Sequence, residues 1–199
     1  VTAGYDYQYW KSTTPLYSEM NTLGEIQKTS KASDERHVLL SYYGRLNYSF
    51  NSRYMLTTTV RRDATSRFAK NVRWGTFPSV ALGWRVTEES FLKDNKVIST
   101  LKVRASYGVT GQQDGIGNYN YLPIYTISQS GAGSLIGDTP TPTYRPKAYV
   151  PNLKWETTTS WNMGFDFGFL KDRITGSFDY YTRQTKDLIA TVPAAAGTT

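Results

Sequence analysis

Cysteine is absent from the 199 residues, and histidine occurs once, as His37. The absence of cysteine excludes disulfide bonds, thiolate metal sites and cysteine nucleophiles from this chain. A zinc cluster or a catalytic triad built on a single histidine would need partners from outside the chain. We therefore expect no enzyme activity, no metal site and no cofactor, with His37 as a polar group at the rim of a sheet.

Long apolar runs are also missing. No stretch approaches the roughly 18 apolar residues of a membrane-spanning helix, and the first ten residues, VTAGYDYQYW, lack the basic start and apolar centre of a signal peptide. The mean hydropathy of −0.50 is typical of a soluble protein. It does not exclude a membrane β-barrel, because each barrel strand turns only every second residue to lipid.

The formal net charge is +7, and a basic balance can indicate a nucleic-acid partner. The basic residues are scattered apart from one loose cluster, which comprises Arg61, Arg62, Arg67, Lys70 and Arg73. No basic helix or nucleic-acid motif accompanies this cluster. We expect a solvated basic rim and no nucleic-acid partner.

Hydrophobicity alternates with a period of two almost everywhere, which predicts β-strands. In the stretch WGTFPSVALGWRV, Val80, Leu82, Trp84 and Val86 alternate with Ser79, Ala81, Gly83 and Arg85. The same alternation recurs over residues 37–50, 54–63, 101–111, 157–169 and 173–186, and more weakly at Tyr5, Tyr7 and Tyr9. The sequence thus predicts about seven antiparallel strands with one apolar face. Charged side chains fall on the other face, namely Arg45, Arg61, Lys102, Arg104, Asp166, Arg173 and Asp179.

The connections between these strands differ in length at the two ends. Tight turns are expected at 51–53 and 171–173, and a moderate link with one possible helical turn follows at 87–100. The links expected at the opposite end are long, near 11–36, 64–73 and 112–156. Loops of such length in a compact domain are usually functional.

Alternation alone fits a soluble glycan-binding β-sandwich as well as a barrel. Three features favour the barrel. The strands are long, since ten residues at about 3.4 Å and a tilt of about 40° span the roughly 25 Å apolar band of an outer-membrane barrel. Aromatic residues gather beside the short turns, at Phe50, Tyr54, Trp84, Phe167 and Phe169. Short periplasmic turns with long extracellular loops are also the layout of such barrels.

Three extended blocks carry a family resemblance: RRDATSRFAKNVRWGTFPSVALGWRVTEESFLK, LKVRASYGVTGQQDGIGNYNYL and PNLKWETTTSWNMGFDFGFLKDRITGSFDYYTRQTKDLI. In order and spacing they resemble the SusC/RagA-type TonB-linked outer-membrane proteins of Bacteroidetes, from about Tyr43 to Pro193. The resemblance implies a plugged barrel of about 22 strands in the bacterial outer membrane. It also implies import of oligosaccharides or peptides, a SusD-like surface lipoprotein as a lid, and energy from TonB.

We expect residues 1–199 to be part of such a barrel, because a plug domain, a TonB box and the remaining strands are missing. The final residues, VPAAAGTT, also lack the terminal aromatic expected of an outer-membrane barrel. TonB would therefore be contacted through parts outside this chain.

The aromatic residues in or beside the longest link are candidates for contact with substrate or lid, because aromatic faces suit sugar rings and peptide side chains. They are Tyr119, Tyr121, Tyr125, Tyr144, Tyr149 and Trp155. The alternative is that they pack the loop against the rim. Asp166 and Asp179 form a possible glycosidase pair, but Arg173 and Arg183 nearby favour a salt-bridge ladder over a hydrolase site.

Overall fold

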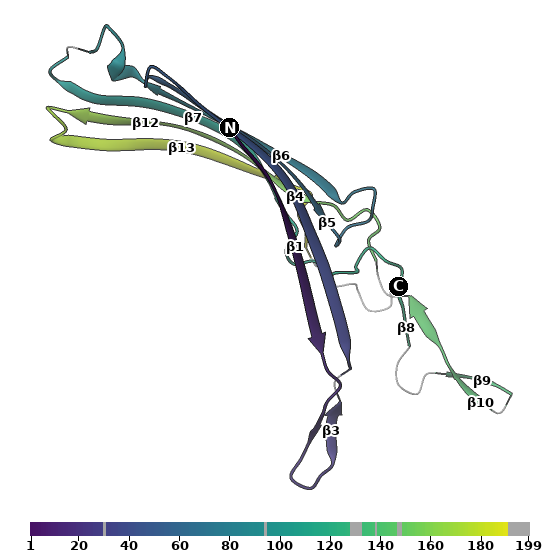
Figure 1. Cartoon of the computed structure of the whole chain (residues 1–199). Helices are drawn as coiled ribbons and strands as arrows, with labels where there is room; N and C mark the ends of the chain where they lie inside the picture. The colour runs from purple at the N-terminus through teal and green to yellow at the C-terminus, as the bar shows by residue number, and fades with distance from the viewer. Residues whose placement is uncertain (30, 94, 128–132, 138, 147–148, 191–199) are drawn as a thin grey trace.

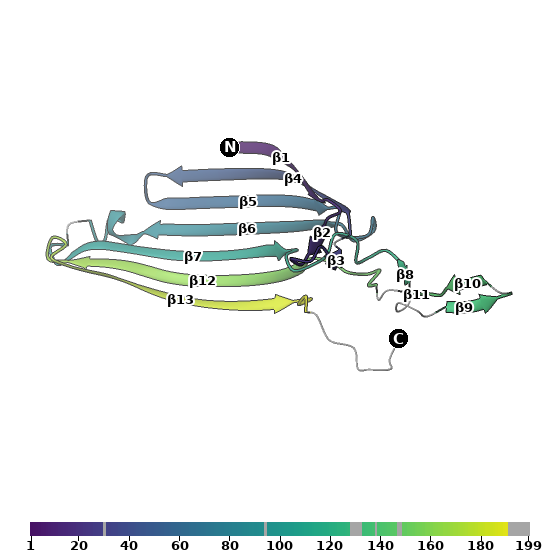
Figure 2. The ribbon, with the colours of Figure 1, turned by 90° about the horizontal axis from the view of Figure 1, so that it is seen from below.

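The computed structural model describes residues 1–29, 31–93, 95–127, 133–137, 139–146 and 149–190. Seven long strands form one antiparallel sheet in which each strand pairs with the next long strand along the chain (Figures 1 and 2). They are β1 (Thr2–Thr14), β4 (Ser33–Phe50), β5 (Tyr54–Thr65), β6 (Trp74–Arg85), β7 (Ile98–Gln112), β12 (Glu156–Phe169) and β13 (Ile174–Lys186). The prediction of seven sequentially paired antiparallel strands is confirmed. The β-sandwich alternative is wrong for the described residues, since these strands form a single sheet.

The register separates the side chains into two faces, because directly paired residues of antiparallel strands point to the same side. One continuous row across the sheet consists of Tyr48, Leu56, Leu82, Ala105, Met163 and Tyr180. The adjacent row consists of Asn47, Thr57, Ala81, Ser106, Asn162 and Tyr181. We call the face of the first row the apolar face and the face of the second row the polar face.

The apolar face has no cover within the described residues. Leu82 on β6 is 55% exposed, and Met163, near the middle of β12, is 61% exposed. Burial of such side chains is worth about 1.5–3 kcal/mol each. A face of this size therefore needs an apolar environment that the described residues do not provide.

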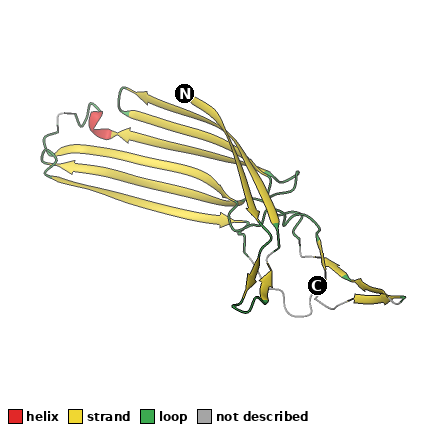
Figure 3. Ribbon diagram, turned by 60° about the horizontal axis from the view of Figure 1, so that its bottom comes forward, coloured by secondary structure: helices red, strands yellow, loops and turns green. Residues whose placement is uncertain are grey.

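Short turns join the strands at one end of the sheet. Asn51 and Ser52 adopt positive φ values of 47° and 55°, the left-handed pair that a tight hairpin turn requires. Backbone hydrogen bonds fasten neighbouring links together, from the Arg85 amide to the Arg53 carbonyl and from the Leu170 amide to the Val97 carbonyl, both at 2.8 Å. The expected helical turn is a 3₁₀ turn, η1 (Val86–Glu88), drawn in red in Figure 3.

Helices contribute little else to the fold. Within the described residues, no helix has both the length and the apolar character needed to cross a membrane.

Glu89 organises the aromatic side chains at this short-turn end. Its carboxylate accepts hydrogen bonds from the Tyr54 hydroxyl at 2.6 Å and from the Trp84 indole at 3.1 Å, and it lies 3.4 Å from the Arg53 guanidinium. These hydrogen bonds, that of Tyr54 above all, hold the pKa of Glu89 below its ordinary value. The predicted grouping of Phe50, Tyr54 and Trp84 beside the turns is confirmed, with Phe50 stacked on Tyr54 at 6.5 Å.

The long links lie at the opposite end of the sheet, and two of the three carry small hairpins of their own (Figure 1). The hairpins are β2 (Ser18–Met20) with β3 (Ile26–Thr29), β8 (Tyr125–Ile127) with β11 (Tyr144–Pro146), and β9 (Gly133–Ile136) with β10 (Thr139–Pro142). The first link is shorter than expected, because Lys11 pairs with Arg36 and the β1–β4 ladder continues to Thr14 and Ser33. The C-terminal stretch 192–199, VPAAAGTT, lies outside the described residues.

Candidate ligand-facing site at the long-loop end

A buried apolar cluster lies on the polar face at the long-loop end. It consists of Phe68, Phe77, Ile116 and Trp155. Phe77 comes from β6, whereas Phe68 and Ile116 come from the links after β5 and β7. Trp155 is 7% exposed, and its ring makes edge-on contacts with Phe68 at 5.5 Å and with Phe77 at 5.3 Å. The cluster fastens two long links to the strand wall.

Hydrogen bonds reinforce this attachment. The Trp155 indole donates to the Arg73 carbonyl at 2.9 Å. The Arg67 guanidinium, only 16% exposed, donates to the Asn118 side chain at 3.1 Å and to the Gln113 carbonyl at 3.4 Å, and lies 3.7 Å from Asp114. The first residues of the longest link are therefore bound to the link after β5.

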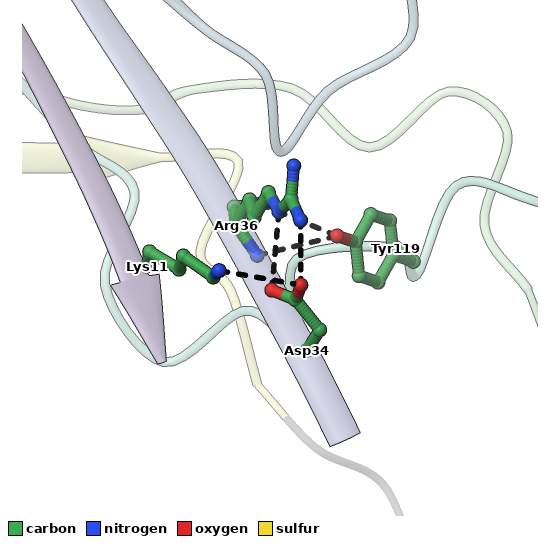
Figure 4. Close-up of polar contacts among 4 residues, drawn as sticks. All are labelled: Lys11, Asp34, Arg36 and Tyr119. Carbon is green, nitrogen blue, oxygen red and sulfur yellow. Dashed lines mark hydrogen bonds and ion pairs between the residues drawn. The ribbon is translucent and has the colours of Figure 1, made fainter. Parts of the chain in front are cut away.

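A second attachment joins the longest link to the extended β1–β4 ladder (Figure 4). The Tyr119 hydroxyl accepts a hydrogen bond from the Arg36 amide at 3.2 Å and donates to the Arg36 carbonyl at 3.5 Å. The Arg36 guanidinium is paired with Asp34 at 2.5 Å, and Lys11 lies 3.7 Å from the same carboxylate. Tyr119 is 38% exposed, so part of its ring stays open to a ligand.

A hollow of about 530 Å³ lies on the polar face beside the buried cluster. Its wall combines the Trp155 and Phe77 rings with the polar side chains of Arg61, Asp63 and Gln113. Arg61 donates to Asp63 at 2.8 Å and to the buried Ser41 hydroxyl at 3.1 Å. The Gln113 side-chain carbonyl is buried and has no hydrogen-bond partner within the described residues. The hollow thus offers aromatic surface and one charged donor, Arg61, and its wall contains one buried acceptor without a partner among the described residues.

The predicted site tyrosines occupy different places in the longest link. Tyr125 and Tyr144 belong to the β8–β11 hairpin, and their registers place them on one face of it. Both are exposed, as is Tyr149, whereas Tyr121 is half-buried. The Val150 amide donates to the Asn120 carbonyl at 2.9 Å, which brings Tyr149 beside the segment that holds Tyr119 and Tyr121.

Trp155 differs from the tyrosines because it packs the loop against the wall, as the alternative interpretation expected. The sequence places Arg67, Gln113 and Asn118 in the long links at this end but does not predict the contacts between them. The sequence nevertheless contains one sign of the buried cluster: Phe77 is an aromatic residue on a strand face that is otherwise small or polar.

The carboxylates Asp166 and Asp179 do lie close together on the polar face, near the middle of the sheet. Arg104 joins them, with a guanidinium nitrogen 2.8 Å from Asp166 and 3.2 Å from Asp179. The predicted ladder is therefore correct in kind but wrong in its cation: among the described residues, neither Arg173 nor Arg183 takes part in an ion pair. A carboxylate pair bridged by arginine is a structural charge network.

The predicted basic rim is divided by the pleat of β5. Arg61 points to the polar face and pairs with Asp63, whereas Arg62 points to the apolar face and lies over the Trp74 ring. Of the three members of the basic cluster that lie in the loop, Arg67 and Arg73 are half-buried and Lys70 is exposed. His37, expected as a polar rim group, is stacked on Trp10 at 4.3 Å.

Comparison with known proteins accounts for this architecture. A sequence model of the family described as "TonB dependent receptor-like, beta-barrel" matches residues 1–199. The chain belongs to the TonB-dependent receptor β-barrel family. The apolar face of this TonB-dependent receptor segment accordingly meets the lipid of the bacterial outer membrane, and the polar face lines the barrel interior.

Individual TonB-dependent receptors confirm the SusC/RagA resemblance. The chain is 54% identical over 163 residues to the TonB-dependent receptor SusC of Bacteroides thetaiotaomicron, which covers 82% of this chain and 16% of that protein. It is 36% identical over 174 residues to the TonB-dependent receptor P39 of Formosa agariphila, which covers 87% of this chain and 16% of that protein. This TonB-dependent receptor segment thus spans less than a fifth of the length of these relatives.

Solved structures agree with the fold. The sheet superimposes on the RagAB peptide importer in the "open-open" state with a TM-score of 0.78 and 26% identity, over 97% of this chain and 22% of that chain. For the "closed-closed" state the TM-score is 0.76 and the identity is 25%, with the same coverage. The seven strands therefore form a section of a larger barrel wall.

Proposed function

We propose that this chain forms a wall section of a TonB-linked importer that carries oligosaccharides or peptides across the outer membrane. Its family membership supports this proposal, as does its likeness to a receptor named SusC and to a structure titled as a peptide importer. TonB would act through parts of the protein outside this chain. Transport, and not catalysis, is the activity we assign, since the carboxylate pair of the polar face is bridged by Arg104.

The observation that carries the proposal is the collection of polar and aromatic groups at the long-loop end. The long links would be extracellular, because short turns mark the periplasmic end of outer-membrane barrels. A substrate entering from outside would first meet the exposed tyrosines of 112–156 and then the hollow that holds Arg61, Asp63 and Gln113.

We assign substrate or lid contact to Tyr119, Tyr121, Tyr125, Tyr144 and Tyr149, and we assign loop anchoring to Trp155. A SusD-like surface lipoprotein would cover the long-loop end. Tyrosine rings suit both sugar faces and peptide side chains, so the aromatic groups do not separate the two substrate classes.

A loop replacement tests this proposal. Tyr125 and Pro146 face each other in the β8–β11 register, so a short Gly-Ser link can replace residues 125–146 without pulling on the chain. The anchors Ile116, Asn118 and Trp155 lie outside the replaced span. We expect unchanged assembly in the outer membrane, with reduced uptake from an oligosaccharide and peptide panel or reduced recovery of the surface lipoprotein.

The matched control is Phe91→Ala, which removes an exposed aromatic side chain at the short-turn end. It should change neither uptake nor lipoprotein recovery. Normal uptake together with normal lipoprotein recovery after the loop replacement would overturn the role assigned to Tyr125 and Tyr144, the two tyrosines that the replacement removes.

A further inference from the structure

Charged side chains are rare on the apolar face. Along the seven long strands, all of which lie within the described residues, the register places five on this face, namely Lys11, Asp34, Arg36, Arg62 and Lys186. Lys11, Asp34 and Arg36 belong to the projecting part of the β1–β4 ladder, and Lys186 is the last residue of β13. Arg62 alone lies among the apolar residues of the sheet, between Val60 and Ala64 on its face.

The height of Arg62 places it near the outer edge of the apolar band. It lies eight residues from Tyr54, which starts β5 at the short-turn end. At about 3.4 Å per residue and a tilt of about 40°, the rise between the two residues is roughly 21 Å, against an apolar band of about 25 Å. Lipid headgroups begin at this level.

Aromatic rings fix the guanidinium in place. Its central carbon lies 5.0 Å from the centre of the Trp74 ring. The Tyr42 ring stacks against Trp74, with the ring centres 6.2 Å apart and 15° between the ring planes. The register sets Tyr42 and Thr76 directly beside Arg62 on the neighbouring strands. Two hydroxyl groups and a guanidinium therefore lie together on a lipid-facing surface.

Arg62 also has no carboxylate partner among the residues that the structure describes. Arg61, Arg67 and Arg104 each have a carboxylate within 4 Å, whereas Arg62 takes part in no ion pair among the described residues. An arginine facing lipid without a counter-charge is costly unless it reaches polar headgroups or binds an anion there. At this level the anionic groups that the membrane itself supplies are the phosphates of the lipid headgroups.

We propose that Arg62, together with Tyr42, Thr76 and Trp74, binds a phosphate group of an outer-leaflet glycolipid. The planar guanidinium matches a phosphate in bidentate fashion, and the stacked Trp74 ring limits its movement. The hydroxyls of Tyr42 and Thr76 supply further donors. This site rests on the orientation given under the proposed function, with the long links outside.

Native mass spectrometry of the intact transporter tests the site. The protein is exchanged into detergent with bisphosphorylated lipid A, or with the same lipid after phosphatase treatment, and the retained lipid is counted. Wild-type protein should retain the phosphorylated lipid, and Arg62→Gln should weaken that retention about tenfold, the effect of one lost charge-assisted hydrogen bond. The matched control is Arg45→Gln, which alters an arginine on the polar face, and it should retain lipid as the wild type does.

Several outcomes would overturn the site. The first is that Arg62→Gln retains the phosphorylated lipid as well as the wild type does. The second is that Arg45→Gln loses as much of this lipid as Arg62→Gln. If Arg62→Gln fails to assemble, the deciding outcome is that the wild type retains the phosphorylated and the dephosphorylated lipid equally. Inorganic phosphate should not displace the lipid at equal concentration; displacement would identify the ligand as free phosphate and refute a lipid site. Preference for an inner-leaflet phospholipid would refute the orientation as well, whereas failure of the loop replacement alone would leave this site standing.

Discussion

Removal of the Trp155 side chain should release the longest link from the strand wall. Trp155→Ala deletes a ring that is 7% exposed and packs against Phe68 and Phe77. A buried aromatic side chain covers about 150–250 Å², worth about 4–6 kcal/mol at 25 cal/mol per Å², and measured losses for such changes are about 3–5 kcal/mol. The lost energy belongs to loop docking, because the strand ladders do not depend on this residue.

Hydrogen exchange of the intact transporter measures this release. The Val150 amide, bonded to the Asn120 carbonyl, should exchange at least about 10²-fold faster in Trp155→Ala, since 3 kcal/mol corresponds to about that factor. The Arg85 amide at the short-turn end should be unchanged. Trp155→Phe keeps most of the packing and loses only the indole hydrogen bond to Arg73, which is worth about 1 kcal/mol.

The exposed neighbour Tyr149 supplies the control, and Tyr149→Ala should leave both amides as they are in the wild type. Unchanged exchange at Val150 in Trp155→Ala would refute the anchoring role. If Trp155→Phe keeps the loop protected but abolishes uptake, the indole contacts ligand and the assignment of Trp155 to packing is wrong.

Two further changes test the packing and the short-turn end. Gly111→Ala places a methyl group inside the Phe77 ring and should lower the free energy of unfolding by about 1–3 kcal/mol in urea titration, whereas Gly44→Ala, with open space around it, should not. The lowered pKa of Glu89 means that its ionised form contributes stability above its ordinary pKa of 4.5, and that this contribution is lost as the pH falls through the lowered value. The stability gap between wild type and Glu89→Gln should therefore be constant above pH 4.5 and shrink below it; a gap that persists at lower pH would contradict the ionic role.

The strands were predictable because each one carries its own pattern. Alternation such as that of Val80, Leu82 and Trp84 is local, and the tight turns at 51–53 and 171–173 fixed which strands pair. Strand ends were less predictable, since the β1–β4 ladder continues through polar residues such as Lys11 and Asp34 that carry no alternation signal.

The site was harder to predict because its contacts are distant in sequence. Arg67 meets Asn118, and Trp155 meets Arg73, across gaps of 51 and 82 residues. No local pattern specifies such pairs. The same limit explains why Arg104, rather than Arg173 or Arg183, bridges Asp166 and Asp179.

Single cysteines test directly which face of the sheet meets lipid. Cysteine is absent from residues 1–199, so Leu82→Cys and Arg85→Cys, in an intact transporter free of other cysteines, each give one labelled position. A fluorescent probe at position 82 should be quenched by brominated lipid and a probe at position 85 by an aqueous quencher. The opposite result would contradict the assignment, because a one-residue shift of register exchanges the two faces of every strand.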